Sequence, residues 1–138
     1  MTLHANIVGA WELVSYTERE LPDGPLTYPH GPDALGLIMY TPDGYMSAQL
    51  ARPGPDEDDQ EPDGYYIAYS GPYDVDEQTR TVAHRVQVSV IPSWLGTTQI
   101  RRVHFREPGM LVLSTSEPRP GDGVMSTTTI SWSRQPPR

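Results

Sequence analysis

The stretch Gly9-Ala10-Trp11-Glu12-Leu13-Val14-Ser15-Tyr16 decides the fold when it is compared with Thr129-Ile130-Ser131-Trp132-Ser133-Arg134 near the other end of the chain. A Gly-x-Trp that opens the first strand, and an arginine that closes the last, indicate a sheet whose ends meet. Such a sheet seals the base of a barrel, and a closed barrel of this size can hold one small ligand.

Composition limits the classes of protein to which this chain can belong. Its 138 residues suffice for one hydrophobic core, so residues 1–138 are expected to form a single domain. The net charge of -8 repels phosphate backbones and anionic lipids, which predicts neither a nucleic-acid nor a membrane partner. The chain has 0 cysteines, so disulfides, thiolate nucleophiles and cysteine-based metal sites are excluded. No signal-peptide core is present, which predicts a cytoplasmic protein.

Apolar and polar residues alternate with a period of two along most of the chain, which is typical of half-buried strands. The connections are short, and they predict an all-β, eight-stranded antiparallel up-and-down barrel, with up to ten strands if loops add short ones. Residues 2–8 are the one expected helical turn. The proline-rich residues 21–33 are expected to form a loop over the mouth, and the acidic residues 52–64 a mobile surface loop. The predicted strands cover residues 10–20, 35–41, 44–51, 65–75, 79–90, 97–106, 109–115 and 123–134.

Several motifs together resemble the small bacterial and fungal proteins of the lipocalin-like domain family. The shared residues include Gly9-x-Trp11-x-Leu13-x-Ser15, Tyr40-Thr41-x-Asp43-Gly44-x-Met46-Ser47, Tyr69-Ser70-Gly71-x-Tyr73-x-Val75-Asp76 and Thr81-Val82-x-His84. Pro92-x-Trp94-x-Gly96-Thr97-x-Gln99-x-Arg101-Arg102 and Trp132-x-Arg134 continue the pattern to the C-terminus. The resemblance implies a calycin-type barrel with a central cavity. It also implies that Trp11 packs at the closed end, with Arg134 lying across it.

Alternation places candidate functional side chains inside the barrel. On residues 79–90, His84 shares a face with Val82, Val86, Val88 and Val90, so it is expected to point inward as a structural hydrogen-bonding group or as an acid or base. On residues 97–106, Gln99 and Arg101 share the face of Val103 and Phe105. They could hold a carbonyl, enolate or carboxylate group of a ligand, although an internal ion pair or a solvated Arg101 would also explain the pattern. The opposite parity would exchange Arg101 for Arg102.

The other candidates are mainly aromatic. Tyr69 could donate a proton, and the predicted ligand-binding residues are Ser15, Tyr40, Tyr73, Trp94 and Gln99. Aromatic walls with few polar groups suit a planar organic molecule, although core packing explains them equally well. Met46, Ala48 and Leu50 are expected to face inward, which turns Ser47 and Gln49 outward, although a polar ligand would reverse this assignment. Val14 and Tyr16, on the outer face of the first strand, could form a homodimer patch or be shielded by residues 21–33.

Three functions remain open at the level of the sequence. One is a module that binds a small, largely apolar, polyketide- or terpenoid-like molecule. Another is a cofactor-free cyclase or isomerase that uses His84, Arg101 and Tyr69 as catalytic residues, with Gln99 as a ligand contact. The third is a filled barrel without ligand. The sequence lacks a Gly-x-Ser-x-Gly elbow, a phosphate-binding glycine loop and metal-ligand spacing among its histidines, so no metal or cofactor is predicted.

Overall fold

The computed structural model describes residues 2–53, 66–118 and 122–138. Within these residues the chain forms the short helix α1 (Leu3–Ile7), the 3-10 helix η2 (Pro92–Trp94) and ten strands. The strands are β1 (Gly9–Glu20), β2 (Leu26–Thr27), β3 (Leu35–Tyr40), β4 (Tyr45–Ala51), β5 (Tyr66–Asp76), β6 (Thr81–Arg85), β7 (Val88–Ser89), β8 (Thr98–Arg106), β9 (Met110–Pro118) and β10 (Met125–Arg134). The predicted acidic loop falls mainly on residues 54–65, which lie outside the described residues.

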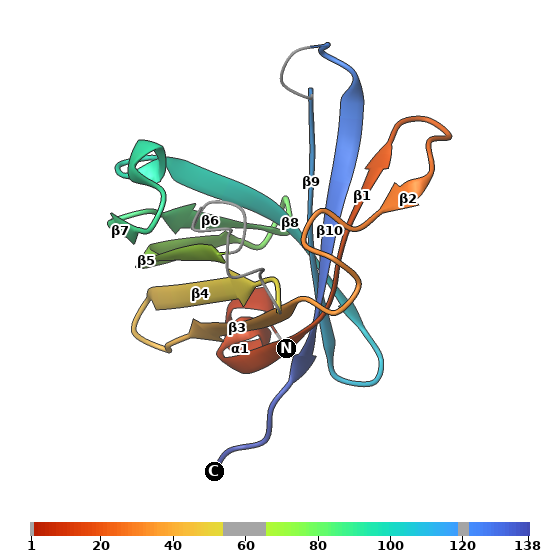
Figure 1. The fold of residues 1–138 in the computed structure, drawn as a ribbon. Helices are drawn as coiled ribbons and strands as arrows, with labels where there is room; N and C mark the ends of the chain where they lie inside the picture. Colours follow the sequence, from red (N-terminus) through yellow and green to blue (C-terminus); the bar gives the residue numbers. More distant parts are fainter. Residues whose placement is uncertain (1, 54–65, 119–121) are drawn as a thin grey trace.

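Strands β1, β3, β4, β5, β6, β8, β9 and β10 form a closed antiparallel barrel, because β10 pairs with β1 as well as with β9. Strand β2 extends β1, and β7 adds to β5. The predicted eight-stranded barrel, with up to two further strands and an N-terminal turn, is therefore confirmed. Strands β3 to β6 run crosswise to β9 and β10, and β1 passes from one group to the other (Figure 1).

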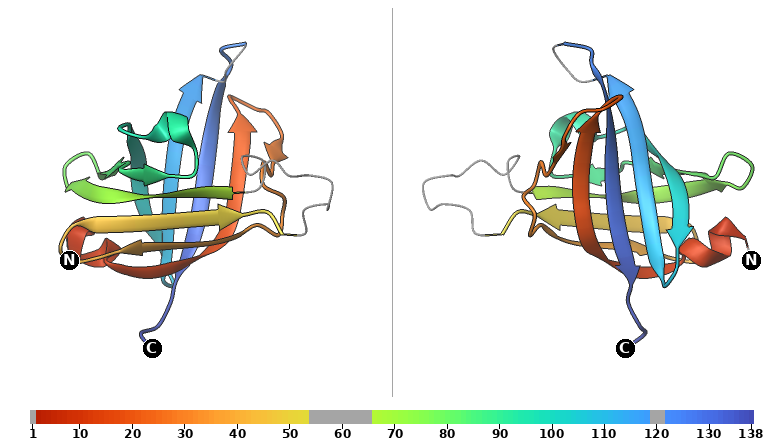
Figure 2. Two further views of the ribbon diagram at one scale, coloured as in Figure 1. Left: turned by 60° about the vertical axis from the view of Figure 1, so that its left-hand side comes forward. Right: turned by 90° about the vertical axis from the view of Figure 1, so that its right-hand side faces the viewer.

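Helix α1 covers one end of the barrel. Leu3 and Ile7 are buried, and the backbone N–H groups of Leu3 and His4 donate hydrogen bonds of 2.7 and 3.0 Å to the Glu77 carboxylate. These backbone hydrogen bonds lower the pKa of Glu77. Figure 2 shows α1 and the departing C-terminal residues at the lower end, while β1, β9 and β10 extend beyond the upper end. One end is thus closed and the other is the mouth.

The predicted long strand at residues 79–90 is wrong in its second half. Strand β6 ends at Arg85, and the chain crosses closely over Gly71, where a Cβ atom would lie only 1.8 Å from the Arg85 carbonyl oxygen. Tyr73 pairs with His84 and Ser70 pairs with Val88, so the segment from β6 to β7 contains one more residue than the part of β5 that it faces. Because this bulge reverses the parity of the strand, Val88 and Val90 are exposed rather than facing the interior.

A second bulge, at Val14, reverses the predicted faces of β1 beyond Leu13. Leu13 pairs with Trp132 but Ser15 pairs with Ser131, so Val14 is the extra residue and is 51% exposed. Beyond the bulge, Tyr16 and Glu18 face the interior instead of Ser15. Ser15 therefore does not line the cavity described below, and Tyr16 cannot join Val14 in an outer dimer patch.

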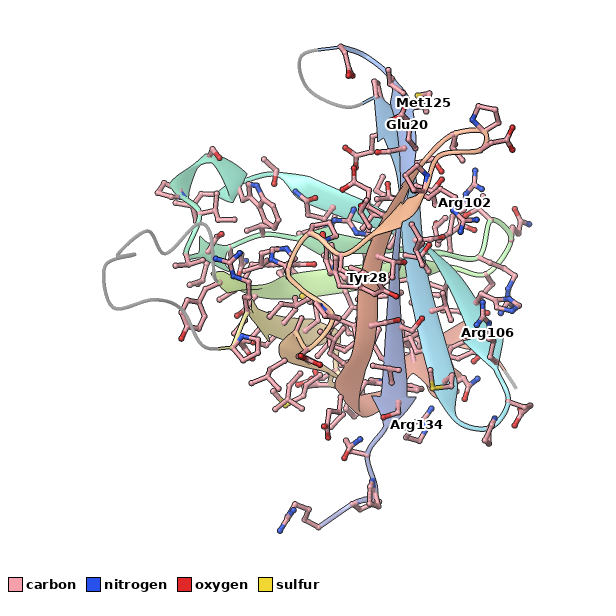
Figure 3. The ribbon with its side chains drawn as sticks, turned by 45° about the vertical axis from the view of Figure 1, so that its right-hand side comes forward. Glu20, Tyr28, Arg102, Arg106, Met125 and Arg134 are labelled. Carbon is pink, nitrogen blue, oxygen red and sulfur yellow. The ribbon has the colours of Figure 1, made fainter. Side chains whose placement is uncertain are left out.

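The core fills the lower half of the barrel. Its largest fully buried side chains belong to Trp11, Trp132, Tyr40, Ile7, Ile38, Leu111, Leu113, His84 and Val82. Met46, Ala48 and Leu50 are buried as the alternation of β4 predicts. On β8, Arg102 and Arg106 lie on the outer side (Figure 3), and Gln99 and Arg101 lie on the inner side. No helix in the described residues is long and apolar enough to cross a membrane.

Candidate functional site: a two-chambered cavity in the barrel

The upper half of the barrel contains an outer chamber of about 430 Å³. Its apolar lining is aromatic and aliphatic and is formed by Tyr16, Ile67, Trp94, Leu113 and Ile130. Its polar lining comes from the ends of β1, β8, β9 and β10, namely Glu18, Gln99, Arg101, Thr115, Glu117, Ser126 and Thr128. This volume lies in the range of pockets that enclose small organic ligands. The barrel is therefore not filled by its own side chains.

An inner chamber of about 30 Å³ lies directly behind the outer one, because the two share the side chains of Tyr16, Ile67, Trp94, Arg101, Leu113 and Ile130. Its remaining lining comes from deeper in the core and consists of Ile38, Ala48, Leu50, Tyr69, His84 and Trp132. This space suffices for a water molecule or one small functional group. The cavity thus narrows from a wide vestibule to a one-group recess.

His84 lies at the recess between two tyrosines. Its Nε2 is 2.7 Å from the Tyr40 hydroxyl, and its Nδ1 is 2.7 Å from the Tyr69 hydroxyl. Burial, with a smaller contribution from the positive charge of Arg101, lowers the pKa of His84 to about 3. The imidazole is therefore neutral at physiological pH, and one of its nitrogens donates a hydrogen bond while the other accepts one.

The tautomer of His84 depends on which of the two tyrosine hydroxyl groups donates a hydrogen bond to the imidazole. Tyr40 is 2% exposed, and His84 Nε2 is its one hydroxyl partner among the described residues. Tyr69 lines the inner chamber, where its hydrogen can meet another acceptor, and Tyr40 does not, so we assign the His84 proton to Nδ1, with Tyr40 donating to Nε2. Nδ1–H then donates to the Tyr69 oxygen. The Tyr69 hydrogen is thereby left for the inner chamber, which Tyr69 lines. Burial raises the pKa of Tyr69 to about 12, so this hydroxyl keeps its proton.

Arg101 places a positive charge between the two chambers. Its guanidinium donates to the Ile100 carbonyl at 3.0 Å and to Gln99 Oε1 at 3.2 Å. Within the described parts of the chain, no carboxylate oxygen lies within 4.0 Å of it, although Glu18 and Glu117 line the same outer chamber. The internal ion pair considered from the sequence is therefore not formed by the described residues. Arg101 retains N–H donors for a ligand.

Trp132 contributes a donor that has no partner. The residue is 1% exposed and lines the inner chamber. Among the described residues, its Nε1 is the one buried side-chain nitrogen or oxygen atom without a hydrogen bond. By contrast, the Trp11 Nε1–H donates to the Ile7 carbonyl at 2.9 Å. A buried N–H without an acceptor is costly, so its presence at a cavity wall indicates a site for an oxygen atom.

The predicted site residues separate into three groups. Gln99 lines the outer chamber and His84 and Tyr69 line the inner one, whereas Trp94 and Arg101 line both. Tyr40 and Tyr73 lie behind His84 instead, where their rings meet edge to face at 5.0 Å and Tyr73 donates to the Thr41 carbonyl at 2.7 Å. Neither lines these chambers, and Ser15 is excluded by the bulge.

Several cavity residues were not predicted from the sequence, although alternation along the strands accounts for most of them. Extending the face of Trp132 by steps of two gives Ile130, Thr128 and Ser126, all of which line the cavity. The same step along β9 gives Leu113, Thr115 and Glu117. Only Tyr16 and Glu18 required knowledge of the bulge. In the described residues, no group of three histidine or acidic side chains is placed to hold a metal ion.

Comparison with known proteins agrees with this architecture. The lipocalin-like domain family matches residues 8–135, and the chain belongs to that family. A similar protein is the 4'-hydroxy-3'-methoxypropiophenone carrier protein ppsC of Aspergillus oryzae (strain ATCC 42149 / RIB 40). It is 36% identical over 109 residues, which cover 66% of this chain and 97% of that protein.

Proposed function

We propose that this protein binds one small, largely apolar organic molecule of the polyketide- or terpenoid-like class in the outer chamber, and that it acts as a carrier. The observation that supports this most strongly is the chamber of about 430 Å³ with aromatic and aliphatic walls and Arg101 at its floor. Large apolar walls supply affinity through burial, and a single cationic donor fixes the orientation.

The similar carrier protein narrows the chemical class of ligand that this protein is proposed to bind. The molecule in its name is a planar aromatic ketone with a phenolic hydroxyl group. Tyr16 and Trp94 give the outer chamber aromatic surface against which such a ring can pack, and its oxygen atoms match the polar lining. We therefore take an aryl ketone as the first ligand to test and a terpenoid alcohol of similar volume as the second.

Neighbouring arginines on β8 provide a matched pair for the test. Arg101 lines the cavity, whereas Arg102 is exposed on the outer side of the same strand (Figure 3). Isothermal titration with 4'-hydroxy-3'-methoxypropiophenone is expected to show binding to the wild-type protein. Arg101→Met should lower the affinity about tenfold or more, because a charge-assisted hydrogen bond is lost. Arg102→Met should leave it unchanged. Equal effects of the two substitutions, or no binding of any aryl ketone or terpenoid, would contradict the proposal.

A cofactor-free cyclase or isomerase is the second candidate function, and the hydrogen-bonded chain Tyr69–His84–Tyr40 favours it. A Tyr69 hydroxyl that is free to donate could hydrogen-bond to a substrate carbonyl oxygen, and Arg101 could stabilise the negative charge that develops on that oxygen in the transition state. His84 would then act as a positioning residue, since both of its ring nitrogens are already hydrogen-bonded. Its lowered pKa also makes it a weak base.

Turnover distinguishes the two candidates. If the protein is an enzyme, wild type should convert a member of a panel of polyketide-like ketones, and Tyr69→Phe should abolish conversion while binding persists. A carrier binds the same compounds and returns them unchanged, which chromatography of the recovered ligand would reveal. The carrier proposal is contradicted by conversion that depends on Tyr69.

A further inference from the structure

The inner chamber presents donors and lacks strong acceptors. Trp132 Nε1–H and the Arg101 guanidinium can only donate, and the Tyr69 hydroxyl has already accepted the hydrogen bond from His84. None of the side chains that line it is a carboxylate. By contrast, the outer chamber contains the carboxylates of Glu18 and Glu117, which can only accept hydrogen bonds when ionised. The cavity therefore changes from acceptors at its mouth to donors at its floor.

The inner chamber is also too small for more than one group. Its volume of about 30 Å³ exceeds what one water molecule needs but is a small fraction of the 430 Å³ of the outer chamber, so the body of a ligand lies in the outer chamber. A group that enters the recess must be compact, must accept hydrogen bonds and must sit at the edge of a larger apolar body. A carbonyl oxygen has all three properties, and a hydroxyl group satisfies the donors less well because it brings a hydrogen of its own.

We propose that the inner chamber is a subsite for one carbonyl oxygen of the ligand, held by Trp132 Nε1–H together with Tyr69 and Arg101. This inference rests on the proposed function and deepens it, since it specifies the class of ligand and the direction in which it lies. The ligand enters with its carbonyl group toward Trp132 and directs any hydroxyl group at its other end toward Glu18 and Glu117.

A pair of probes that differ only in the replacement of a carbonyl oxygen by two hydrogens tests the subsite. In 4'-hydroxy-3'-methoxypropiophenone a carbonyl group links the ring to the ethyl group, and in 2-methoxy-4-propylphenol a methylene group takes the place of that carbonyl. Titration calorimetry should show the ketone binding to wild type about tenfold or more tightly than the propyl compound. In Trp132→Phe, which removes the donor and keeps an aromatic ring, the difference should fall to about threefold or less.

The indole N–H signals provide a second readout that needs no variant of Trp132. The chain has 3 tryptophans, so a nitrogen-15 correlation spectrum shows three such signals. Addition of the ketone should move the Trp132 signal downfield and slow its exchange with solvent, whereas the propyl compound should not. The Trp11 signal is the internal control and should stay in place, because Trp11 already donates to Ile7.

Each outcome decides a different point. If both probes bind with equal affinity and the Trp132 signal does not respond to the ketone, the recess holds only a water molecule and the carbonyl subsite is refuted, while the binding function stands. If neither probe binds, the proposed function itself fails and this inference fails with it. A larger response to the propyl compound than to the ketone would also overturn the subsite.

Discussion

The guanidinium carbon of Arg134 lies 4.1 Å from the centre of the Trp11 ring, although 122 residues lie between the two in the sequence. Arg134 also donates to the carbonyl groups of Val8, at 3.0 Å, and Asn6. The two residues are directly opposite each other in the pairing of β1 with β10. This contact joins the seam of the barrel to the residues that precede β1, at the closed end.

Removal of the Arg134 side chain should destabilise the barrel without altering the cavity. Arg134→Ala loses the cation–π contact and leaves two backbone carbonyl groups without a donor, so we expect a decrease of about 1–2 kcal/mol in the free energy of unfolding. Arg102→Ala, on the exposed face of β8, should change it by less than about 0.5 kcal/mol. Urea denaturation measures both. Equal stabilities of the two variants would show that the Arg134 contact contributes nothing to closure.

Substitution of Gly71 should destabilise the barrel more than substitution of Arg134. A Cβ atom at this position would lie 1.8 Å from the Arg85 carbonyl oxygen, which belongs to the backbone and cannot turn aside. Gly71→Ala must therefore separate β5 from the end of β6, and we expect a loss of more than about 3 kcal/mol or failure to fold. No atom lies within 4 Å of a Cβ atom added at Gly44, so Gly44→Ala should lower the free energy of unfolding only by the strain of a positive φ, about 1 kcal/mol. Thermal unfolding of the two variants compares steric overlap with backbone strain, and a Gly71→Ala protein as stable as Gly44→Ala would contradict the close crossing.

Most strands could be predicted because alternation is a local signal that they obey. The residues that share a face of β4 or β8 follow from it directly. Closure of the barrel and the proximity of Trp11 to Arg134 were instead indicated by the motifs at the two ends of the chain and by the resemblance to the lipocalin-like family. Bulges could not be predicted in this way, since the extra residue, Val14 in β1, is as apolar as the residues that alternate normally. Propensity favours valine in a strand, but only the pairing with β10 determines which residue is left out.

The Val14 bulge determines which side chains reach the ligand cavity. Deletion of Val14 would make Leu13 and Ser15 neighbours opposite Trp132 and Ser131, so uninterrupted alternation would still direct Tyr16 and Glu18 to the interior. We therefore expect the deletion to leave ligand affinity within about threefold of the wild-type value. Tyr16→Ala should lower the affinity at least about tenfold, because an aromatic wall is lost. Calorimetry on both variants measures the difference, and unaltered binding in Tyr16→Ala would contradict the role of Tyr16 as a wall.

The candidate site was only partly predictable for a related reason. His84, Gln99 and Arg101 could be assigned to the interior from the parity of their strands. The depth of a residue along the barrel has no signature in alternation, so Tyr40 and Tyr73 could not be distinguished from Tyr69. All three are buried on inner faces, but only Tyr69 reaches the cavity. The free donor on Trp132 is likewise a property of the folded core, since it depends on which acceptors surround it.

Burial of His84 as a neutral base predicts how stability depends on pH. Its pKa falls from 6.5 to about 3 on folding, so the unfolded chain takes up a proton first as the pH decreases. The stabilisation is fully present above pH 6.5 and is lost progressively toward pH 3, by up to about 1.4 kcal/mol per pH unit. The pKa of His30 is also lowered, by burial and by Arg52, so it adds a smaller loss in the same direction.

His84→Gln isolates this contribution, because glutamine can hydrogen-bond to Tyr40 and Tyr69 but does not titrate. The variant should be less stable than wild type at pH 7.5, since an amide cannot reproduce the geometry of both 2.7 Å hydrogen bonds. Between pH 6.5 and 4.5, its stability should decrease much less steeply than that of wild type, measured by urea denaturation at each pH. His104→Gln, at an exposed position of β8, serves as the control and should retain the wild-type slope. If His84→Gln also kept that slope, the folded protein would have to accommodate a charged His84, and the neutral Tyr69–His84–Tyr40 chain would be wrong.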